Sequence, residues 1–390
     1  MNSSTVALGK IAKITSGGTP ARENPSYWNG DIPWVKTSQV QNCIIKLAHI
    51  DECITEEGSR RSSAKLIPAG SILMAMVGQG KTRGQVAVLD IDAAINQNCA
   101  AIILKDGADR DYVYQQLRFR YEEIRNASNS SGQQNLNAAL IRSLRIPLPG
   151  YAAQKKIGTW LSEWDSAIQK FEQLIAAKDD RYTHELSRLI SQGKDARSHV
   201  GNCAHQVSER NRSGNDVRVL SVTNSRGFVL PEDQFERRVA SADLSNYKVV
   251  TRGQYAYNPS RINVGSIARL DDWETGVLSP MYVVFGLDNA KVNSDYFLHW
   301  LDSHEARERI KKSAQGSVRE TVSFTEFAAI AFPLPDLDRQ AAIARYLNAL
   351  REEISTLGVY VEKLKEQKRG LMQKLLTGQW RVNVPSSGDA

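Results

Sequence analysis

The chain of 390 residues contains the same pattern twice. LRIPLPGYAAQKKIGTWL, which begins at Leu144, returns as IAFPLPDLDRQAAIARYL from Ile330. Matching residues lie 186 positions apart, as in the pairs Pro147/Pro333, Pro149/Pro335, Gln154/Gln340, Ile157/Ile343, Leu161/Leu347 and Ile168/Ile354. Further upstream, Gly70 aligns with Gly253 and Gly84 aligns with Gly265. An internal repeat of this length predicts two similar folded units within one chain.

Each copy continues into a long heptad pattern, in which apolar residues alternate at spacings of four and three. Lys178, Glu185 and Lys368 interrupt the two stripes, and Gly193 and Gly378 follow them. Helices of roughly 40 residues would be about 60 Å long, so we expect them to pair antiparallel, with one globular unit at each end of a rod. The alternative is that each stripe is the core face of its own domain. The residues expected to pair are Ile157, Leu161, Trp164, Ile168, Phe171 and Ile175, and Ile343, Leu347, Leu350, Ile354, Leu357, Val361 and Leu364.

The predicted fold class is α+β, with two similar α/β domains separated by two long antiparallel coiled-coil helices and related by a pseudo-two-fold repeat. Short β-type runs and one helical stretch occur in each unit, Tyr112 to Arg125 in the first and Tyr296 to Lys312 in the second. The expected boundaries are 1–150 for domain 1, 151–193 for helix 1, 194–335 for domain 2, 336–379 for helix 2 and 380–390 for a flexible tail. Residues 194–215 are polar and contain glycine, which predicts a linker at the start of domain 2.

The stretch MAMVGQGKTRG, from Met74 to Gly84, matches a relaxed form of the phosphate-loop pattern. A phosphate loop must open a helix, whereas here RGQVAVLD follows and predicts a buried strand. The aligned loop of the second copy, NPSRINVG, has no Gly-Lys-Thr. We therefore expect two hairpins with different polar tips, although a nucleotide-dependent enzyme built on GQGKT remains an alternative.

The net charge of +7 and the pI near 9.1 suit a polyanionic partner. Cys43, Cys53, Cys99 and Cys203 form no Cys-x-x-Cys pair, so we expect neither disulfides nor a metal site. His199, Cys203 and His205 in HVGNCAH supply at most three metal ligands, and their role is left open. No signal peptide and no long apolar run are present, which predicts a cytoplasmic protein without a membrane partner.

Three features together resemble one family, the specificity subunits of type I restriction-modification enzymes. They are LGKIAKITSGGTPARENPSYWNGDIPWVKTSQV from Leu8 to Val40, the repeated PLP-helix block, and the closing LMQKLLTGQ. The resemblance covers nearly the whole chain, but the second copy lacks an SGGTP segment. It implies two target recognition domains that each read one half of a bipartite double-stranded DNA target, and two helices that set the spacing. It also implies two modification (methyltransferase) subunits, which hold S-adenosylmethionine, and restriction subunits, which use ATP.

No catalytic site and no cofactor are therefore expected in this chain. An amino-methyltransferase needs an Asn-Pro-Pro-aromatic type of motif, and the nearest string, Asn258 to Arg261, lacks both the second proline and the aromatic residue. No glycine-rich cofactor turn was found between a strand and a helix. A purely structural coiled-coil tether is a further alternative, although it gives the two β-containing units no role.

The polar loops supply side chains that suit DNA, because Arg prefers the guanine edge and Gln or Asn the adenine edge. The candidates in domain 1 are Lys36, Ser38, Gln39, Gln79, Lys81, Arg83, Gln133, Gln134 and Asn135. The candidates in domain 2 are Thr223, Asn224, Arg226, Asn258, Arg261, Asn263, Gln315, Ser317 and Arg319. Which base each residue would meet does not follow from the sequence.

Overall fold

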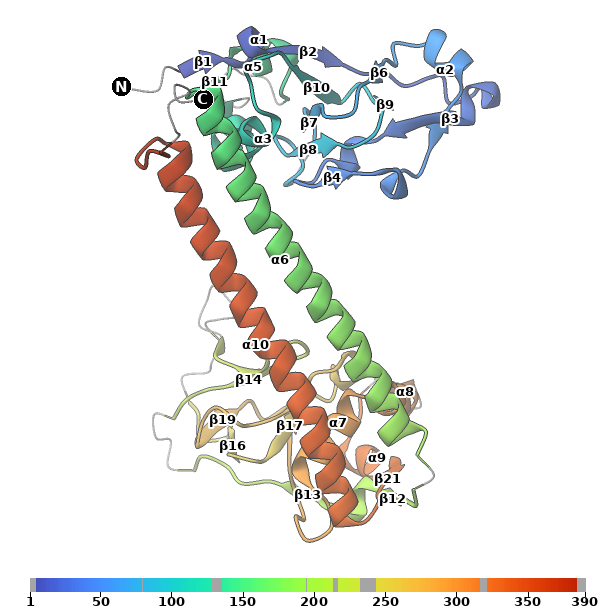
Figure 1. Ribbon diagram of the computed structural model, residues 1–390. Coiled ribbons are helices and arrows are strands. Elements are labelled where there is room, and N and C mark those ends of the chain that lie inside the picture. Colours follow the sequence, from blue (N-terminus) through green and yellow to red (C-terminus); the bar gives the residue numbers. More distant parts are fainter. Residues whose placement is uncertain are drawn as a thin grey trace. The chain divides into compact units, whose positions relative to one another are not determined.

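The computed structural model describes residues 5–78, 80–127, 135–193, 195–212, 217–231, 243–315 and 321–383. The chain divides into two compact units, of which unit 1 is Met1–Phe171 with Tyr360–Ala390 and unit 2 is Glu172–Val359. Each unit contains one of the two predicted domains together with a part of each long helix (Figure 1). Over the ranges that are described, no helix is both long and apolar enough to span a membrane.

Unit 1 is built on two sheets. The strands of the first follow the order β2 (Ala12–Ser16), β10 (Cys99–Leu104), β7 (Ile72–Ala75), β8 (Val86–Leu89) and β4 (Ile44–Ile45). The second has the order β5 (Cys53–Ile54), β3 (Trp28–Val35), β9 (Ala93–Ile95) and β6 (Leu66–Ile67), and β1 (Thr5–Ala7) pairs with β11 (Arg145–Pro147). Strands β7 and β8 are buried at every position, which explains why they are continuous apolar runs.

The helices of unit 1 cover these sheets. They are α1 (Leu8–Ile11), α2 (Glu56–Arg60), α3 (Arg110–Phe119), α4 (Tyr121–Ala127) and α5 (Ala138–Ser143), with the 3-10 turns η1 (Pro25–Tyr27), η2 (Thr37–Gln39) and η3 (Leu47–His49). The Asp109 carboxylate accepts from the Tyr112 N–H at 2.9 Å and so caps α3. The single helical stretch predicted from Tyr112 is therefore two helices with a break at Arg120.

Unit 2 has one four-stranded sheet and three separate strand pairs among its described residues. One sheet has the order β13 (Ala204–Val207), β20 (Val283–Leu287), β17 (Tyr255–Tyr257) and β18 (Ile267–Arg269). Strand pairs are formed by β12 (Arg197–His199) with β21 (Ala331–Pro333), β14 (Ser221–Thr223) with β15 (Gly227–Val229), and β16 (Lys248–Thr251) with β19 (Thr275–Leu278). The helical elements are η5 (Val200–Asn202), η7 (Ile262–Val264), α7 (Ser294–Asp302), α8 (His304–Gln315) and α9 (Phe324–Ala328).

Residues 194–215 were predicted to be a linker, and the described part of this segment, 195–212, shows that the prediction is wrong there. The segment holds β12 and β13, and Val200, Cys203 and Ala204 are buried. The Val200 N–H donates to the Ile330 carbonyl at 3.0 Å, just as the Leu8 N–H donates to Leu144 at 2.7 Å in unit 1. This segment is thus the counterpart of residues 5–16. The prediction failed because an edge strand with exposed side chains can be polar, and its pairing partner is more than a hundred residues away.

The two long helices are α6 (Tyr151–Leu186), which ends in a π-turn η4 (Ser187–Ser191), and α10 (Leu337–Leu376). In unit 1 the ring of Phe171 lies 5.0 Å from that of Tyr360, and Asp165 meets Lys368. Position numbers rise along α6 as they fall along α10, so the segments pair antiparallel, as predicted. Figure 1 shows the two helices side by side.

The apolar stripe of each helix has two roles. Ile157 and Leu161 are buried in the core of domain 1, and Ile343 and Leu347 are buried in the core of domain 2. The alternative, that each apolar stripe is the core face of its own domain, is therefore correct for the first turns of each helix. Leu350 also belongs to the core of domain 2, and Ile354 packs against that core. Helices pack against each other further along, where Ile168 and Val361 are buried and Trp164, Phe171, Ile175, Leu357 and Leu364 are partly exposed.

Candidate nucleic-acid interface

In unit 1 several polar loops meet at one end of the five-stranded sheet. Strand β7 ends at Ala75, and β8 and β10 begin nearby in the antiparallel ladder. The Met76 N–H donates to the Asn98 carbonyl at 2.9 Å, and the Leu136 N–H donates to the Met76 carbonyl at 3.0 Å. The loop after β7, the loop before β10 and the segment at Asn135 are thus brought together although they are far apart in the sequence.

The loop between β7 and β8 is the predicted hairpin tip. It leads into strand β8 and not into a helix, which removes the structural context that a phosphate loop requires. Gly84 has a φ of 88°, a left-handed conformation that favours glycine. The Tyr121 hydroxyl donates to the Lys81 carbonyl at 2.6 Å, so helix α4 supports the tip. Lys81 is exposed and Arg83 is half-buried, while the candidates Gln79, Gln133 and Gln134 lie outside the described residues.

The segment after β3 divides into supporting and exposed side chains. The Gln39 amide accepts from the Lys36 N–H at 2.7 Å and donates to the His49 carbonyl. The Lys36 ammonium pairs with Glu52 at 3.2 Å. These two candidates therefore stabilise the loop from within, while Ser38 and Asn135 are exposed.

Sequence reasoning missed Asn96, Gln97 and Asn98, which form the loop between β9 and β10. The Thr37 hydroxyl donates to Asn96 Oδ1 at 2.9 Å, and the Thr19 hydroxyl donates to Gln97 Oε1. Gln97 is exposed at the same end of the sheet as Lys81. The signal available in the sequence was a run of three amide side chains between two apolar strands.

The SGGTP segment packs closely instead of presenting side chains. A Cβ on Gly17 would lie 1.8 Å from the Ile95 carbonyl oxygen, and the Trp34 indole donates to the Gly18 carbonyl at 3.0 Å. Arg22 stacks 3.8 Å above the Trp28 ring, and its guanidinium is the main cause of the lowered pKa of Glu52. This motif therefore holds the second sheet against the first.

Unit 2 brings its candidate loops together in the same way. The β14–β15 turn contains Asn224, and a Cβ on Gly265 would lie 3.8 Å from the Asn224 Cβ. The Ser266 hydroxyl donates to the Val222 carbonyl at 2.8 Å, which joins the β17–β18 loop to the hairpin. The Val322 N–H donates to the Pro259 carbonyl at 3.1 Å, in parallel with Leu136 and Met76 of unit 1.

The individual candidates of unit 2 differ in exposure. The Thr223 hydroxyl donates to the Gly227 carbonyl at 3.1 Å and accepts from the Arg226 N–H at 3.0 Å, so buried Thr223 shapes the turn. Asn224, Arg226 and Arg261 are exposed, and Asn258 and Asn263 are half-buried. The Asn258 amide oxygen accepts from the Ser260 N–H at 3.0 Å. The Gln315 side chain, Ser317 and Arg319 lie outside the described residues.

The HVGNCAH residues do not converge on a site. Cys203 is buried, and burial raises the pKa of its thiol to about 11. His199 and His205 are exposed. Within the described ranges no group of three metal-ligating side chains is assembled.

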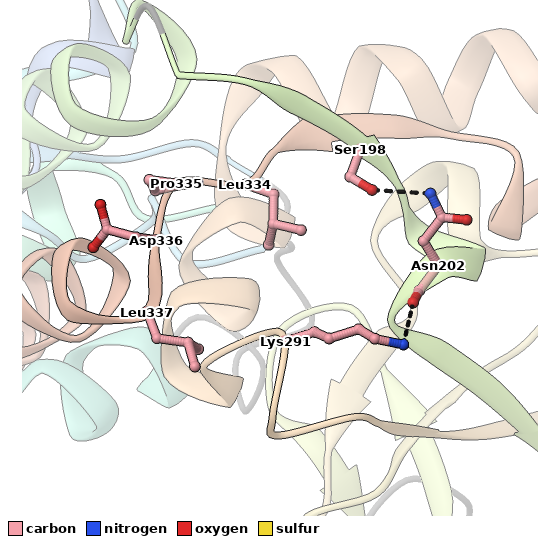
Figure 2. A pocket seen from close by; sticks show the side chains of 7 residues that line it. All are labelled: Ser198, Asn202, Lys291, Leu334, Pro335, Asp336 and Leu337. Atoms are coloured by element: carbon pink, nitrogen blue, oxygen red, sulfur yellow. Dashed lines mark hydrogen bonds between the residues drawn. The ribbon is translucent and has the colours of Figure 1, made fainter.

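A hollow of about 650 Å³ lies where domain 2 joins α10 (Figure 2). Its lining is Ser198, Asn202, Lys291 and the turn Leu334 to Leu337. The Lys291 ammonium donates to the Asn202 carbonyl at 3.3 Å and pairs with Asp288 at 3.1 Å. The hollow therefore belongs to the joint between domain and helix, and its one cation already has protein partners.

Comparison with known proteins agrees with this architecture. The family model described as the type I restriction modification DNA specificity domain matches residues 2–177. The MjaIX specificity subunit of a type I restriction enzyme from Methanocaldococcus jannaschii is 30% identical over 41% of this chain and 37% of its own length. The EcoR124I/EcoR124II specificity subunit from Escherichia coli is 30% identical over 47% of each chain. These two matches thus span less than half the length of either relative.

Other similarities extend over the whole chain. The putative MjaX specificity subunit from M. jannaschii is 22% identical over 97% of this chain and 93% of that protein. The S subunit of the type I restriction-modification system from M. genitalium covers 96% of each chain with a TM-score of 0.61 and 15% identity, which establishes a shared fold. The two-domain plan, the repeated helix and these matches lead to one conclusion: residues 2–177 carry the type I restriction modification DNA specificity domain, and the chain is similar along nearly its whole length to type I restriction enzyme specificity subunits.

Proposed function

We propose that this chain is the DNA sequence-recognition subunit of a type I restriction-modification complex, with each recognition domain reading one half of a bipartite target. One observation carries the proposal. In both units, polar loops from distant parts of the sequence gather at one end of a sheet, and they do so at equivalent places in a duplicated fold. A duplicated scaffold whose loops differ in side chains suits the reading of two different half-sites.

The exposed and half-buried residues of these loops have the chemistry that DNA requires. Cations contact phosphates and provide affinity, while Arg, Asn and Gln discriminate base edges. Domain 1 would use Ser38, Lys81, Arg83, Gln97 and Asn135, and domain 2 would use Asn224, Arg226, Asn258, Arg261 and Asn263. Lys36, Gln39 and Thr223 would act indirectly, by holding the loops in shape.

The helices would set the half-site spacing and dock two methyltransferase subunits. In unit 1 the paired helices leave an apolar groove of about 500 Å³ that includes Trp164, Phe171 and Tyr360. Trp160 at its edge is 39% exposed and Tyr360 is 47% exposed. Aromatic side chains that are left half-exposed in this way are typical of protein-protein interfaces. The methyltransferase subunits would hold S-adenosylmethionine and the restriction subunits would use ATP, while this chain would hold no cofactor and catalyse no step.

Two measurements test the proposal. The chain is combined with its methyltransferase subunits and used to select ligands from random DNA duplexes, and host DNA methylation is mapped with and without the gene for this chain. We expect one split motif with a fixed spacer in both data sets. Selection without any motif, together with unchanged methylation, would contradict the proposal.

A further inference from the structure

Lys368, which interrupts the heptad pattern of α10, is buried in unit 1 with 5% of its surface exposed. Its ammonium donates to Asp165 Oδ1 on α6 at 2.5 Å and to Gln115 Oε1 on α3 at 3.4 Å. The other oxygen of the Asp165 carboxylate accepts from Arg118 at 2.7 Å and from Gln115 at 2.7 Å. One anion on α6 thus lies between a cation on α3 and a cation on α10.

The same four positions are occupied in unit 2, but with the charges rearranged. The repeat relates Asp165 to Arg351 and Lys368 to Tyr182, 186 positions apart, and relates Gln115 to His299 and Arg118 to Asp302, 184 positions apart. Arg351 pairs with Asp302 and donates to the Tyr182 hydroxyl at 2.7 Å. Tyr182 in turn contacts His299 Nδ1 at 2.9 Å.

His299 shows why the unit 2 cluster takes a phenol. Burial, with the nearby Arg351, lowers the pKa of His299, so the imidazole stays neutral at pH 7. Its Nε2 donates to Asn348 Oδ1 at 2.8 Å, which leaves Nδ1 to accept from the Tyr182 hydroxyl. Tyr182 therefore meets both of its neighbours, because it accepts from Arg351 and donates to His299.

The central residue is an anion, Asp165, in the unit 1 cluster and a cation, Arg351, in the unit 2 cluster. The partner on the paired long helix suits the charge in each case. Asp165 faces an ammonium, and Arg351 faces an oxygen. If two α10 helices from separate chains paired in this register, Arg351 of each would face Lys368 of the other. Two cations would then meet where neither can accept a hydrogen bond from the other, beside the half-buried Asp302 that already pairs with Arg351, which is unfavourable compared with the native pairs.

A second contact, an ion pair between the two long helices, also favours the pairing of α6 with α10. Lys178 of α6 bonds to Glu353 of α10 at 2.6 Å in unit 2. The positions equivalent to this pair in unit 1 are Leu364 and Ala167, both apolar. Pairing α10 with α10 would place Glu353 against Leu364, and pairing α6 with α6 would place Lys178 against Ala167. Either homotypic pair loses this ion pair.

We propose that these inverted clusters specify the pairing of α6 with α10, and that Lys368 and Arg351 together reject pairing between the α10 helices of two chains. A duplicated helix needs such a device, because two copies of one apolar stripe would otherwise pair with themselves as readily as with each other. The inference goes beyond DNA recognition and does not depend on it.

The test uses the full chain with Val359→Cys. In an α10–α10 pair of this register the symmetry axis passes between Val359 and Tyr360, so the two introduced thiols would lie close together. In a dimer that exchanges helices but keeps α6–α10 contacts, position 359 would face α6 instead. The chain is refolded from denaturant and treated with a short bismaleimide, and covalent dimer is measured. The chain without Val359→Cys gives the background from native cysteines.

Lys368→Tyr places at position 368 the residue found at the equivalent position 182. We expect it to raise the yield of covalent dimer about tenfold over the Val359→Cys chain that keeps Lys368, because the repulsion between Lys368 and Arg351 is lost. Lys368→Arg keeps the charge and should leave the dimer yield unchanged. Because Lys368→Tyr also removes a native ion pair, a second arm uses Asp302→Lys with Arg351→Glu, which gives unit 2 the polarity of unit 1 and leaves Lys368 in place. It should raise the yield as well. A yield at the wild-type level in both arms, or an equal rise with Lys368→Arg, would overturn the proposal.

Discussion

Gln154 and Gln340 make the same three hydrogen bonds in the two units. The Gln154 amide donates to the carbonyls of Gly107 and Pro149 at 3.1 and 2.8 Å and accepts from the Asp109 N–H at 2.9 Å. Gln340 donates to Lys291 and Pro335 at 3.3 and 2.7 Å and accepts from Asn293 at 2.8 Å. Both side chains are at most 2% exposed. Each glutamine thus fastens the first turn of a long helix to the N-cap of a domain helix that lies earlier in the chain, α3 for Gln154 and α7 for Gln340.

Replacing one of these glutamines should weaken its own unit. In Gln154→Leu, the Asp109 N–H and two carbonyls lose their partner in a buried site, so we expect unfolding to become easier by about 2–4 kcal/mol. Urea unfolding gives the free energy, and hydrogen exchange at the Asp109 amide locates the change. Gln173→Leu, an exposed site on the same helix, is the control and should change stability by less than about 0.5 kcal/mol. Equal effects of the two substitutions would contradict the role of Gln154.

Loop cations should contribute to DNA affinity without affecting the fold. Arg261→Ala and Lys81→Ala each remove an exposed side chain from a converging loop, and we expect each to weaken binding to the selected target by about 1–3 kcal/mol. Anisotropy titrations at several salt concentrations separate a phosphate contact, which lowers the salt slope, from a base contact, which relaxes specificity. Lys170→Ala on α6 is the matched exposed control. Unchanged affinity in both loop variants would exclude these two loops from the interface.

Burial lowers the pKa of Lys368 from an ordinary value of 10.5 to about 8. Between these pH values the unfolded chain binds a proton that the folded chain does not, so the free energy of unfolding rises with pH through this group. The slope is at most about 1.4 kcal/mol per pH unit, and below pH 8 it vanishes. Lys368→Met lacks this contribution. Urea midpoints of both proteins at pH 7.5 and 9.5 measure the difference, and identical pH dependence would mean that Lys368 titrates normally.

Gly17 should tolerate no side chain. A Cβ there would lie 1.8 Å from the carbonyl oxygen of Ile95, which is backbone and cannot move aside, so Gly17→Ala should cost more than about 3 kcal/mol or prevent folding. Gly370→Ala is the contrasting variant, because this helical position has nothing within 4 Å. It should raise stability by about 0.5–1 kcal/mol. Thermal melts of both variants provide the comparison, and a stable Gly17→Ala protein would refute the close approach.

The features that could be predicted from the sequence are those that depend on the local spacing of apolar residues or on the internal repeat. Heptad spacing identified both long helices, and the apolar runs at Ile72–Ala75 and Val86–Leu89 identified two central strands. The repeat also located equivalent loops, and Gly84 and Gly265 share the left-handed backbone with φ of 88° and 93°. In each case the signal lies within a few residues of the element it specifies.

The predictions that were wrong, and the residues that were missed, concern side chains and strands whose role depends on contacts made in the folded protein. Thr223 and Gln39 look like any polar loop residues, and only their hydrogen bonds show that they shape loops. The contacts of Asn96 with Thr37 and of Asn98 with Met76 place the loop from Asn96 to Asn98 among the candidate loops, which the sequence does not show. Residues Arg197–His199 form a strand because Ala331–Pro333 is available to pair with them.

By itself, the sequence determined that the protein has two related units joined by two long helices, because duplication and heptad spacing are visible in one dimension. The tertiary structure decided which side chains of those helices enter the domain cores, and that Lys368 meets Asp165 while Tyr182 meets Arg351. The reason is physical. A buried charge is tolerable only beside a particular partner, and that partner is brought near by folding and not by proximity along the chain.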